Sequence, residues 1–362
     1  QAAKRSRIAM EMHQISLALE TYKNKFGEYP PDLYDKAAVV RHVKKRWPRF
    51  NLAGADNNAK YWALLNAVKN VYRNSDMVNL LHNYDNTIGA SSFFMNNDAG
   101  TLTNPTVTQG VQYVGALPFW LGGFPNSDGK LAGFSADPEA PFGTGLGTVS
   151  GETTPTIKIN NGNTSITWTG RIGLGTHDKD SVFYEMIIGK NVEYVTTADG
   201  IVFPVLVNRD ATVNKDGTTP VPYVYFKSNS SNGGKMAYTH YATNIYLSKG
   251  YKFNKVFDTA YAALGQITAY ARSGNVDGDN QPLIWQEAER FQLIHPGLDG
   301  VFGIIRTPKE DAKEIALTDS TTLNISGFRS IDMNITTNDI GQHDFDNITN
   351  FSDYQQIKSI LP

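Results

Sequence analysis

Four oxygen-bearing side chains in the C-terminal quarter of the chain could bind a hard cation. Asp299 lies in segment 297–303, and Asp344, Asp346 and Asn347 lie in segment 343–351. Calcium takes several oxygen ligands, typically carboxylates supplemented by amide and backbone carbonyl oxygens. If the two loops meet, these residues form a calcium site. The same Asp-Gly and Asp-Asn pairs are also common in turns, so the spacing alone leaves a purely structural interpretation open.

Familiar catalytic motifs are absent from the sequence. It contains no Gly-x-Ser-x-Gly elbow, no His-Glu-x-x-His pair and no phosphate-binding loop ending in lysine. The seven histidines are scattered, and none lies three or four residues from another. We therefore expect that the protein is not an enzyme.

The elements that must position the two acidic loops are short strands. A strand is expected at 291–294, followed by a turn at 296–300 and a further strand at 301–305. Upstream, 156–160 and 165–169 alternate polar and apolar residues around an Asn-Gly-Asn turn, which predicts a β-hairpin. Apolar strands are expected at 182–188, 201–207 and 221–226. Segment 256–272 has helical spacing instead.

The N-terminal part of the chain is dominated by helical patterns. Apolar residues three and four apart form one stripe on the first helix, and Gly27 with the Pro30-Pro31 pair ends it. Further helices are expected at 34–47, 57–72 and about 75–81, followed by a glycine-rich stretch at about 85–180. The order of helices, insertion, strands, helix and strands indicates an α+β fold. The stripe consists of Ile8, Met12, Ile15, Leu19, Tyr22 and Phe26.

Composition narrows the possible functions. The chain has 362 residues, a formal net charge of −2 and no cysteine. A near-neutral chain offers no electrostatic footprint for nucleic acid, and disulfides and cysteine-ligated metals are excluded. The most apolar stretch, 111–124, is too short to cross a bilayer.

Both ends of the chain resemble type II secretion pseudopilins and related prepilin-type proteins. Residues 18–33, ALETYKNKFGEYPPDL, are similar to the end of the long N-terminal helix of that family. Residues 291–300, FQLIHPGLDG, and 344–351, DFDNITNF, resemble the family's "DLYSLGADG" and "DADI.NW" segments, which flank a calcium-binding loop. Segments 116–124, 133–138 and 222–226 also look familiar from large, insertion-bearing members. The insertion at 304–342 departs from the family pattern, in which only a few residues separate the two segments.

The resemblance implies a type IV pilin-like fold, with a long N-terminal helix packed on an antiparallel sheet. Residues 1–29 would be the soluble half of an assembly helix, cut after a membrane segment upstream of Gln1, and 30–362 the head, with insertions at about 85–180 and 304–342. Asp299 and Asp344 or Asp346 would inherit calcium-ligand roles. The protein would be a structural filament subunit that contacts other pseudopilins through its helix, anchored in the inner membrane with a periplasmic or cell-surface head.

An alternative function is a filament-tip or surface binding module. Its aromatic-rich head would recognise a glycan or a protein, with exposed rings as stacking platforms. Burial in the core is the competing interpretation for large aromatic residues in strands. The candidate residues are Trp120, Trp168, Tyr223, Tyr225 and Trp285.

Overall fold

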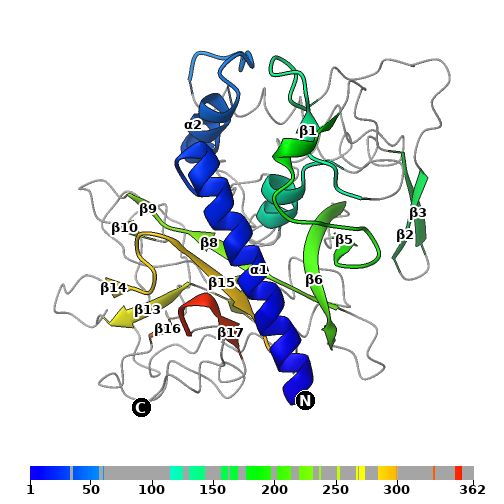
Figure 1. Ribbon diagram of the computed structural model, residues 1–362, viewed down its shortest axis with the longest axis vertical. Helices are drawn as coiled ribbons and strands as arrows, with labels where there is room; N and C mark the ends of the chain where they lie inside the picture. Colours follow the sequence, from blue (N-terminus) through cyan, green and yellow to red (C-terminus); the bar gives the residue numbers. More distant parts are fainter. Residues whose placement is uncertain are drawn as a thin grey trace, which may run out of the picture. The chain divides into compact units, whose positions relative to one another are not determined.

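In the part of the chain that it describes, the computed structural model combines α-helices with mainly antiparallel strands, a mixed α+β arrangement (Figure 1). It forms two compact units. Unit 1 contains Gln1–Ser16, Asn208–Asn254 and Thr259–Pro362, and unit 2 contains Leu17–Val207 and Lys255–Asp258. The structure describes residues 1–32, 36–56, 60, 115–124, 130–142, 156–161, 164–169, 177–196, 202–212, 220–230, 236–237, 251–252, 266–267, 269–273, 284–298, 300, 329–330 and 347–352.

Helix α1 spans Ala2–Phe26 and buries the predicted apolar stripe. Ile8, Met12, Ile15, Leu19 and Tyr22 are each 0 % exposed, and Phe26 is half-buried. Gly27 follows with φ of +77°, and its N–H donates to the Lys23 carbonyl oxygen at 2.6 Å, as expected for a glycine cap. The helix therefore ends at the predicted glycine.

Helix α2, Lys36–Arg46, follows in unit 2 and buries Val39, His42 and Val43. The π-helical turn η1, Pro118–Gly122, is fully buried beside it in the same unit. Trp47, directly after α2, and Phe119 of η1 both pack edge to face on Phe134, with ring centroids 4.9 and 5.4 Å from that of Phe134. This cluster is the core of unit 2.

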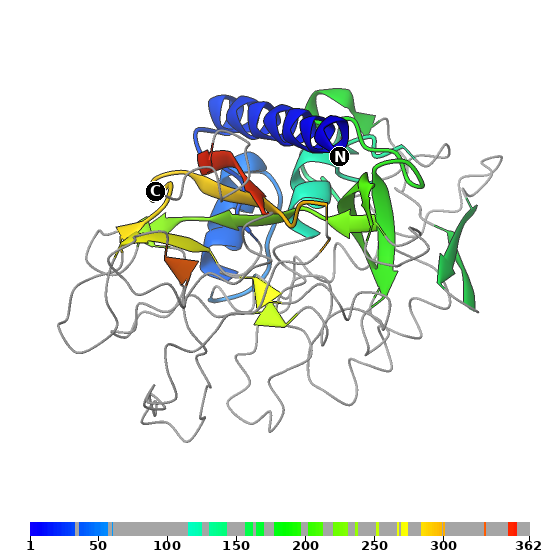
Figure 2. The ribbon, with the colours of Figure 1, turned by 90° about the horizontal axis from the view of Figure 1, so that it is seen from below.

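In unit 1, strand β15 (Phe291–His295) lies between β8 (Val224–Lys227) and β17 (Ile348–Thr349) in an antiparallel sheet (Figure 1). All five residues of β15 are buried. Residues 2–16 of α1 belong to the same unit, and Figure 2 shows this part of α1 along one side of β15 and β17. The 3-10 turn η5, Asn350–Ser352, follows β17.

The remaining strands form small sheets. β13 (Tyr270–Ser273) lies between β14 (Ile284–Trp285) and β16 (Arg329–Ser330), and β6 (Val202–Thr212) lies between β5 (Val192–Thr196) and β7 (Pro220–Pro222). The predicted hairpin is confirmed as β2 (Thr156–Asn161) and β3 (Thr164–Thr169), which pair antiparallel. The other strands pair in twos, β1 (Phe134–Ser135) with β4 (His177–Asp178), β9 (Asn229–Ser230) with β10 (Met236–Ala237), and β11 (Tyr251–Lys252) with β12 (Gln266–Ile267). The 3-10 turn η2, Lys179–Ser181, follows β4.

The expectation of a helix over 256–272 is wrong in its last third, where β12 and β13 form instead. Helical spacing of apolar residues is present there, but Tyr270 pairs with Arg329 and Ala271 with Trp285. Aromatic residues favour strands when partners are available, and these partners come from distant segments. Residues 253–265 lie outside the described part of the chain.

The strand expected at 182–188 is also absent. Only Ile187 and Ile188 form isolated bridges, while the N–H groups of Phe183 and Tyr184 both donate to the Leu121 carbonyl oxygen. A short apolar run does not distinguish a strand from an irregular buried segment. The single strand expected at 221–226 is divided at Tyr223 into β7 and β8, next to Pro222, which has no N–H to donate to a ladder.

Several other expected elements lie outside the described residues. The strand at 301–305 and the helix at 75–81 are entirely outside them, and of the helix at 57–72 only Lys60 is described, as helical.

Candidate functional site

The two predicted calcium-binding segments adjoin paired strands. β15 pairs with β17 in antiparallel register, with Ile294 opposite Thr349 and His295 opposite Ile348. Chain segment 296–300 therefore leaves β15 at the same end of the ladder at which the chain enters β17. This pairing exists although 52 residues separate His295 from Ile348.

Of the four predicted ligands, only Asn347 is described. Its side chain is 0 % exposed, and its Nδ2 donates to the Tyr270 hydroxyl at 2.8 Å. Asp299, Asp344 and Asp346 lie outside the described residues. Within the described part of the chain, no three His, Asp or Glu side chains group as metal ligands. Gly297 and Gly300 have φ of +73° and +70°, which fits the predicted turn.

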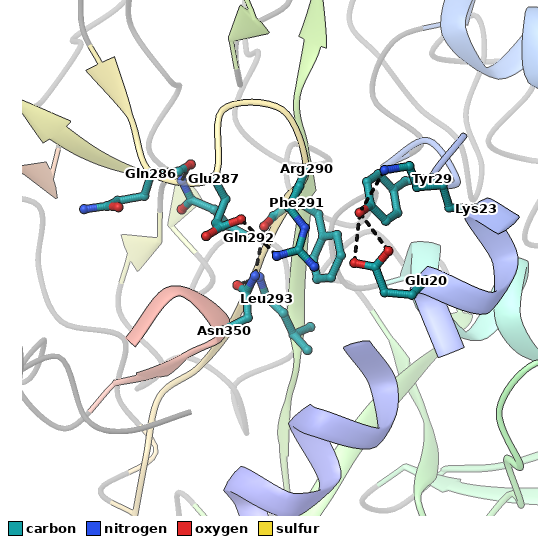
Figure 3. A network of polar contacts seen from close by, with 10 residues as sticks. All are labelled: Glu20, Lys23, Tyr29, Gln286, Glu287, Arg290, Phe291, Gln292, Leu293 and Asn350. Carbon is teal, nitrogen blue, oxygen red and sulfur yellow. Dashed lines mark hydrogen bonds and ion pairs between the residues drawn. The ribbon is translucent and has the colours of Figure 1, made fainter. Parts of the chain in front are cut away.

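Two side-chain amides extend the hydrogen bonding around β15. The Asn350 side chain accepts from Leu293 N–H at 2.8 Å and donates to the Phe291 carbonyl oxygen at 3.1 Å, as Figure 3 shows. The fully buried side-chain amide of Gln292, a residue of β15, bonds instead to the backbone of Tyr270 in another sheet. Each amide pairs both an N–H and a C=O group of a strand backbone, as buried backbone polar groups require.

His295, at the end of β15, is fully buried and uncharged. Its Nδ1 accepts from Gly297 N–H at 3.1 Å, and its ring centroid lies 4.8 Å from that of Tyr223. Nε2 has no hydrogen-bond partner among the described residues. Burial lowers the pKa of His295 to about 3, because the apolar surroundings disfavour the imidazolium.

Unit 2 contains a second polar cluster, which the sequence interpretation missed. The Tyr22 hydroxyl lies 2.6 Å from Nε2 of His42, and Nδ1 of His42 lies 2.8 Å from Oε1 of Glu28. Nη1 of Arg46 donates to the same hydroxyl at 2.9 Å. His42 and Arg46 are four residues apart on α2, so both reach Tyr22 from one face of that helix.

The pKa shifts of Tyr22 and Glu28 follow from their burial and from their charged neighbours. Burial raises the pKa of the Tyr22 phenol, so it keeps its proton beside Arg46. Burial alone would also raise the pKa of Glu28, but the hydrogen bond from His42 and nearby positive charge outweigh it and lower that pKa. A histidine on the buried face of a predicted helix was the sequence signal for this cluster.

Three of the five aromatic residues proposed as stacking platforms are core residues. Trp120, Tyr223 and Tyr225 are each 0 % exposed, so they cannot stack on a ligand from solvent. The side chains of Trp168 and Trp285 lie outside the described set. Burial, the competing interpretation, is confirmed for the first three.

Comparisons with known proteins give no family assignment. The chain matches no protein-family model, no curated protein and no solved structure. Among the helices of the described residues, none has the length and apolar character needed to cross a membrane.

Proposed function

We propose that this chain is a structural subunit of a pseudopilus-like filament, with a type IV pilin-like architecture and α1 as its assembly helix. One observation carries the proposal: α1 is 25 residues long, and its apolar stripe is buried while its opposite face stays exposed. Met10 and Leu17, seven residues apart, are 58 % and 52 % exposed on that face. The buried face of such a helix packs on its own head, while the exposed face can contact a neighbouring subunit at the same time.

The proposed setting follows from the family resemblance. The head would stand in the periplasm or at the cell surface, and the inner membrane would hold the assembly. Other pseudopilin subunits would be the partners, through α1.

Calcium is the proposed stabiliser of the head, with Asp299, Asp344, Asp346 and Asn347 as its ligands. Three carboxylates and an amide oxygen suit calcium chemically. The register of β15 with β17 supports the proposal, since it brings the ends of both ligand-bearing segments to one end of a ladder. When the cation is removed, clustered carboxylates repel one another, so the folded state loses stability.

Filament assembly is tested with the full-length protein in cells, observed by electron microscopy. Leu17→Glu places a charge on the exposed face of α1 and should abolish filaments while leaving the unfolding midpoint of the purified head unchanged. Glu139→Lys, on an exposed loop, is the control that should assemble normally. Normal filaments from the Leu17 variant would contradict the assignment of α1.

Calcium binding is tested by thermal unfolding with calcium and with chelator. The wild-type midpoint should rise in calcium, and Asp299→Asn and Asp344→Asn should each reduce the rise. Asp56→Asn, at an exposed position of unit 2, is the matched control. Identical wild-type midpoints in both buffers would refute the calcium proposal without affecting the filament proposal.

A further inference from the structure

The cluster Glu28–His42–Tyr22–Arg46 has a single consistent direction of hydrogen bonding. Arginine keeps its charge in proteins and only donates, so the Tyr22 oxygen accepts from Arg46. The Glu28 carboxylate also only accepts, so Nδ1 of His42 carries a proton and donates to it. In the neutral ring Nε2 then lacks a proton and accepts from the Tyr22 O–H.

The groups around this chain make its direction hard to reverse. Tyr22 is enclosed by aromatic rings, with the centroids of Phe26 and Phe183 at 4.6 and 4.8 Å. The Trp120 ring meets His42 edge to face at 4.9 Å. Two further buried donors, Arg46 Nη2 and Trp120 Nε1, have no acceptor among the described residues. The described surroundings of Tyr22 are therefore rich in donors.

A second proton on His42 would enter at Nε2, the atom that faces Tyr22. Two donors would then meet across the 2.6 Å contact. The contact could persist only if the Tyr22 O–H turned towards the surrounding rings, which would leave a buried donor unsatisfied. The imidazolium would also face the Arg46 guanidinium, while Glu28, with Arg41 and Lys45 near it, would attract the new charge from the other side.

We propose that His42 is a proton-operated latch, which holds the C-terminal end of α1 against α2 while it carries one proton and releases Tyr22 when it takes a second. The two helices meet in unit 2 through this contact, since Tyr22 lies in the last turns of α1 and His42 and Arg46 lie in α2. The latch is independent of calcium and of filament formation. Its regulator would be the pH of the compartment that holds the head.

The test is NMR of the whole chain with labelled histidine and tyrosine, titrated between about pH 8 and about pH 5, where histidines ordinarily titrate. At the basic end, the His42 ring should show the tautomer with the proton on Nδ1. On acidification, the His42 and Tyr22 signals should change with one shared midpoint. A proton on Nε2 at the basic end, or a His42 titration that leaves Tyr22 unchanged, would overturn the latch.

Two variants should move that midpoint in opposite directions. Tyr22→Phe removes the donor to Nε2, so His42 should take its second proton more readily and the midpoint should rise by about one pH unit. Glu28→Gln removes the carboxylate that favours the imidazolium, so the midpoint should fall by about as much. Shifts of the same sign would refute the proposal. Glu28 is partly exposed, so its variant keeps the test decisive if Tyr22→Phe does not fold.

Discussion

The Gln292 side chain acts as a strand partner for Tyr270. Its Oε1 accepts from Tyr270 N–H at 2.6 Å and its Nε2 donates to the Tyr270 carbonyl oxygen at 2.8 Å, so one side-chain amide completes both backbone groups. Nε2 also donates to the Gln286 carbonyl oxygen at 2.9 Å. Through this amide, β15 is joined to β13, although the two strands belong to different sheets.

Replacing Gln292 by leucine should therefore destabilise unit 1. The change keeps the side-chain volume but leaves the buried N–H and C=O of Tyr270 without these partners, so we expect a loss of about 3 kcal/mol in the free energy of unfolding. Urea denaturation followed by circular dichroism measures the loss. Gln14→Leu, at an exposed position of α1, is the control and should stay within about 0.5 kcal/mol of wild type. Equal effects of both changes would contradict the strand-partner role.

Gly123→Ala should be strongly destabilising because two backbone segments touch there. Gly123 has φ of +72°, and a Cβ would lie 2.4 Å from the backbone of Gly133, with which it forms a bridge. Left-handed strain and the clash together should cost about 3 kcal/mol or more. Gly189→Ala separates the two effects, since Gly189 has φ of +80° but open space around its Cβ, and should cost only about 1 kcal/mol. Thermal unfolding of both variants measures the difference.

His295 should make the head sensitive to acid. Its folded pKa, about 3, is below the ordinary histidine value of about 6.5, so between these values the unfolded chain binds one more proton than the folded chain. The stability linked to neutral His295 is complete above about pH 6.5 and is lost as the pH falls towards 3, by at most about 1.4 kcal/mol per pH unit.

The measurement is urea denaturation at about pH 7 and about pH 5, a range above the ordinary pKa of carboxylates. His295→Gln keeps an acceptor for Gly297 N–H but does not titrate, so its free energy of unfolding should fall less than that of wild type. An equal fall in both proteins would show that His295 is not the source.

Glu11 should stabilise the packing of the first half of α1 within unit 1. Its Oε2 accepts from the Tyr223 hydroxyl at 2.7 Å and from Nδ2 of Asn208. Glu11→Ala leaves two buried donors without this acceptor and should cost about 3 kcal/mol, whereas Glu11→Gln keeps an acceptor and should cost about 1 kcal/mol. Hydrogen exchange of the α1 amides should rise in the alanine variant above all. Similar exchange rates of the α1 amides in both variants would mean that the acceptor oxygen at position 11 does not stabilise the packing of α1.

The elements that are specified by residues close together in the sequence were predicted correctly. The stripe of α1, its glycine cap and the β2–β3 hairpin each rest on residues close in sequence, so periodicity and turn chemistry were sufficient. β15 was also predicted, but its buried Gln292 had no visible partner. The prediction of a helix over 256–272 was wrong in its last third, because strand pairing to Arg329 and Trp285 overrides the helical spacing there. Local sequence patterns do not encode such pairing.

The sequence by itself determined where the first helix ends, which of its faces is apolar, and that side chains suited to bind calcium occur in two distant segments. Only the tertiary structure decided that β15 and β17 pair beside those segments, that Gln292 completes Tyr270, and that Glu28, His42, Tyr22 and Arg46 meet in one chain of hydrogen bonds. The physical reason is the range of the interactions. Helix periodicity and turns depend on neighbours along the chain, whereas a buried polar group is satisfied by whichever partner the packed fold brings within about 3 Å.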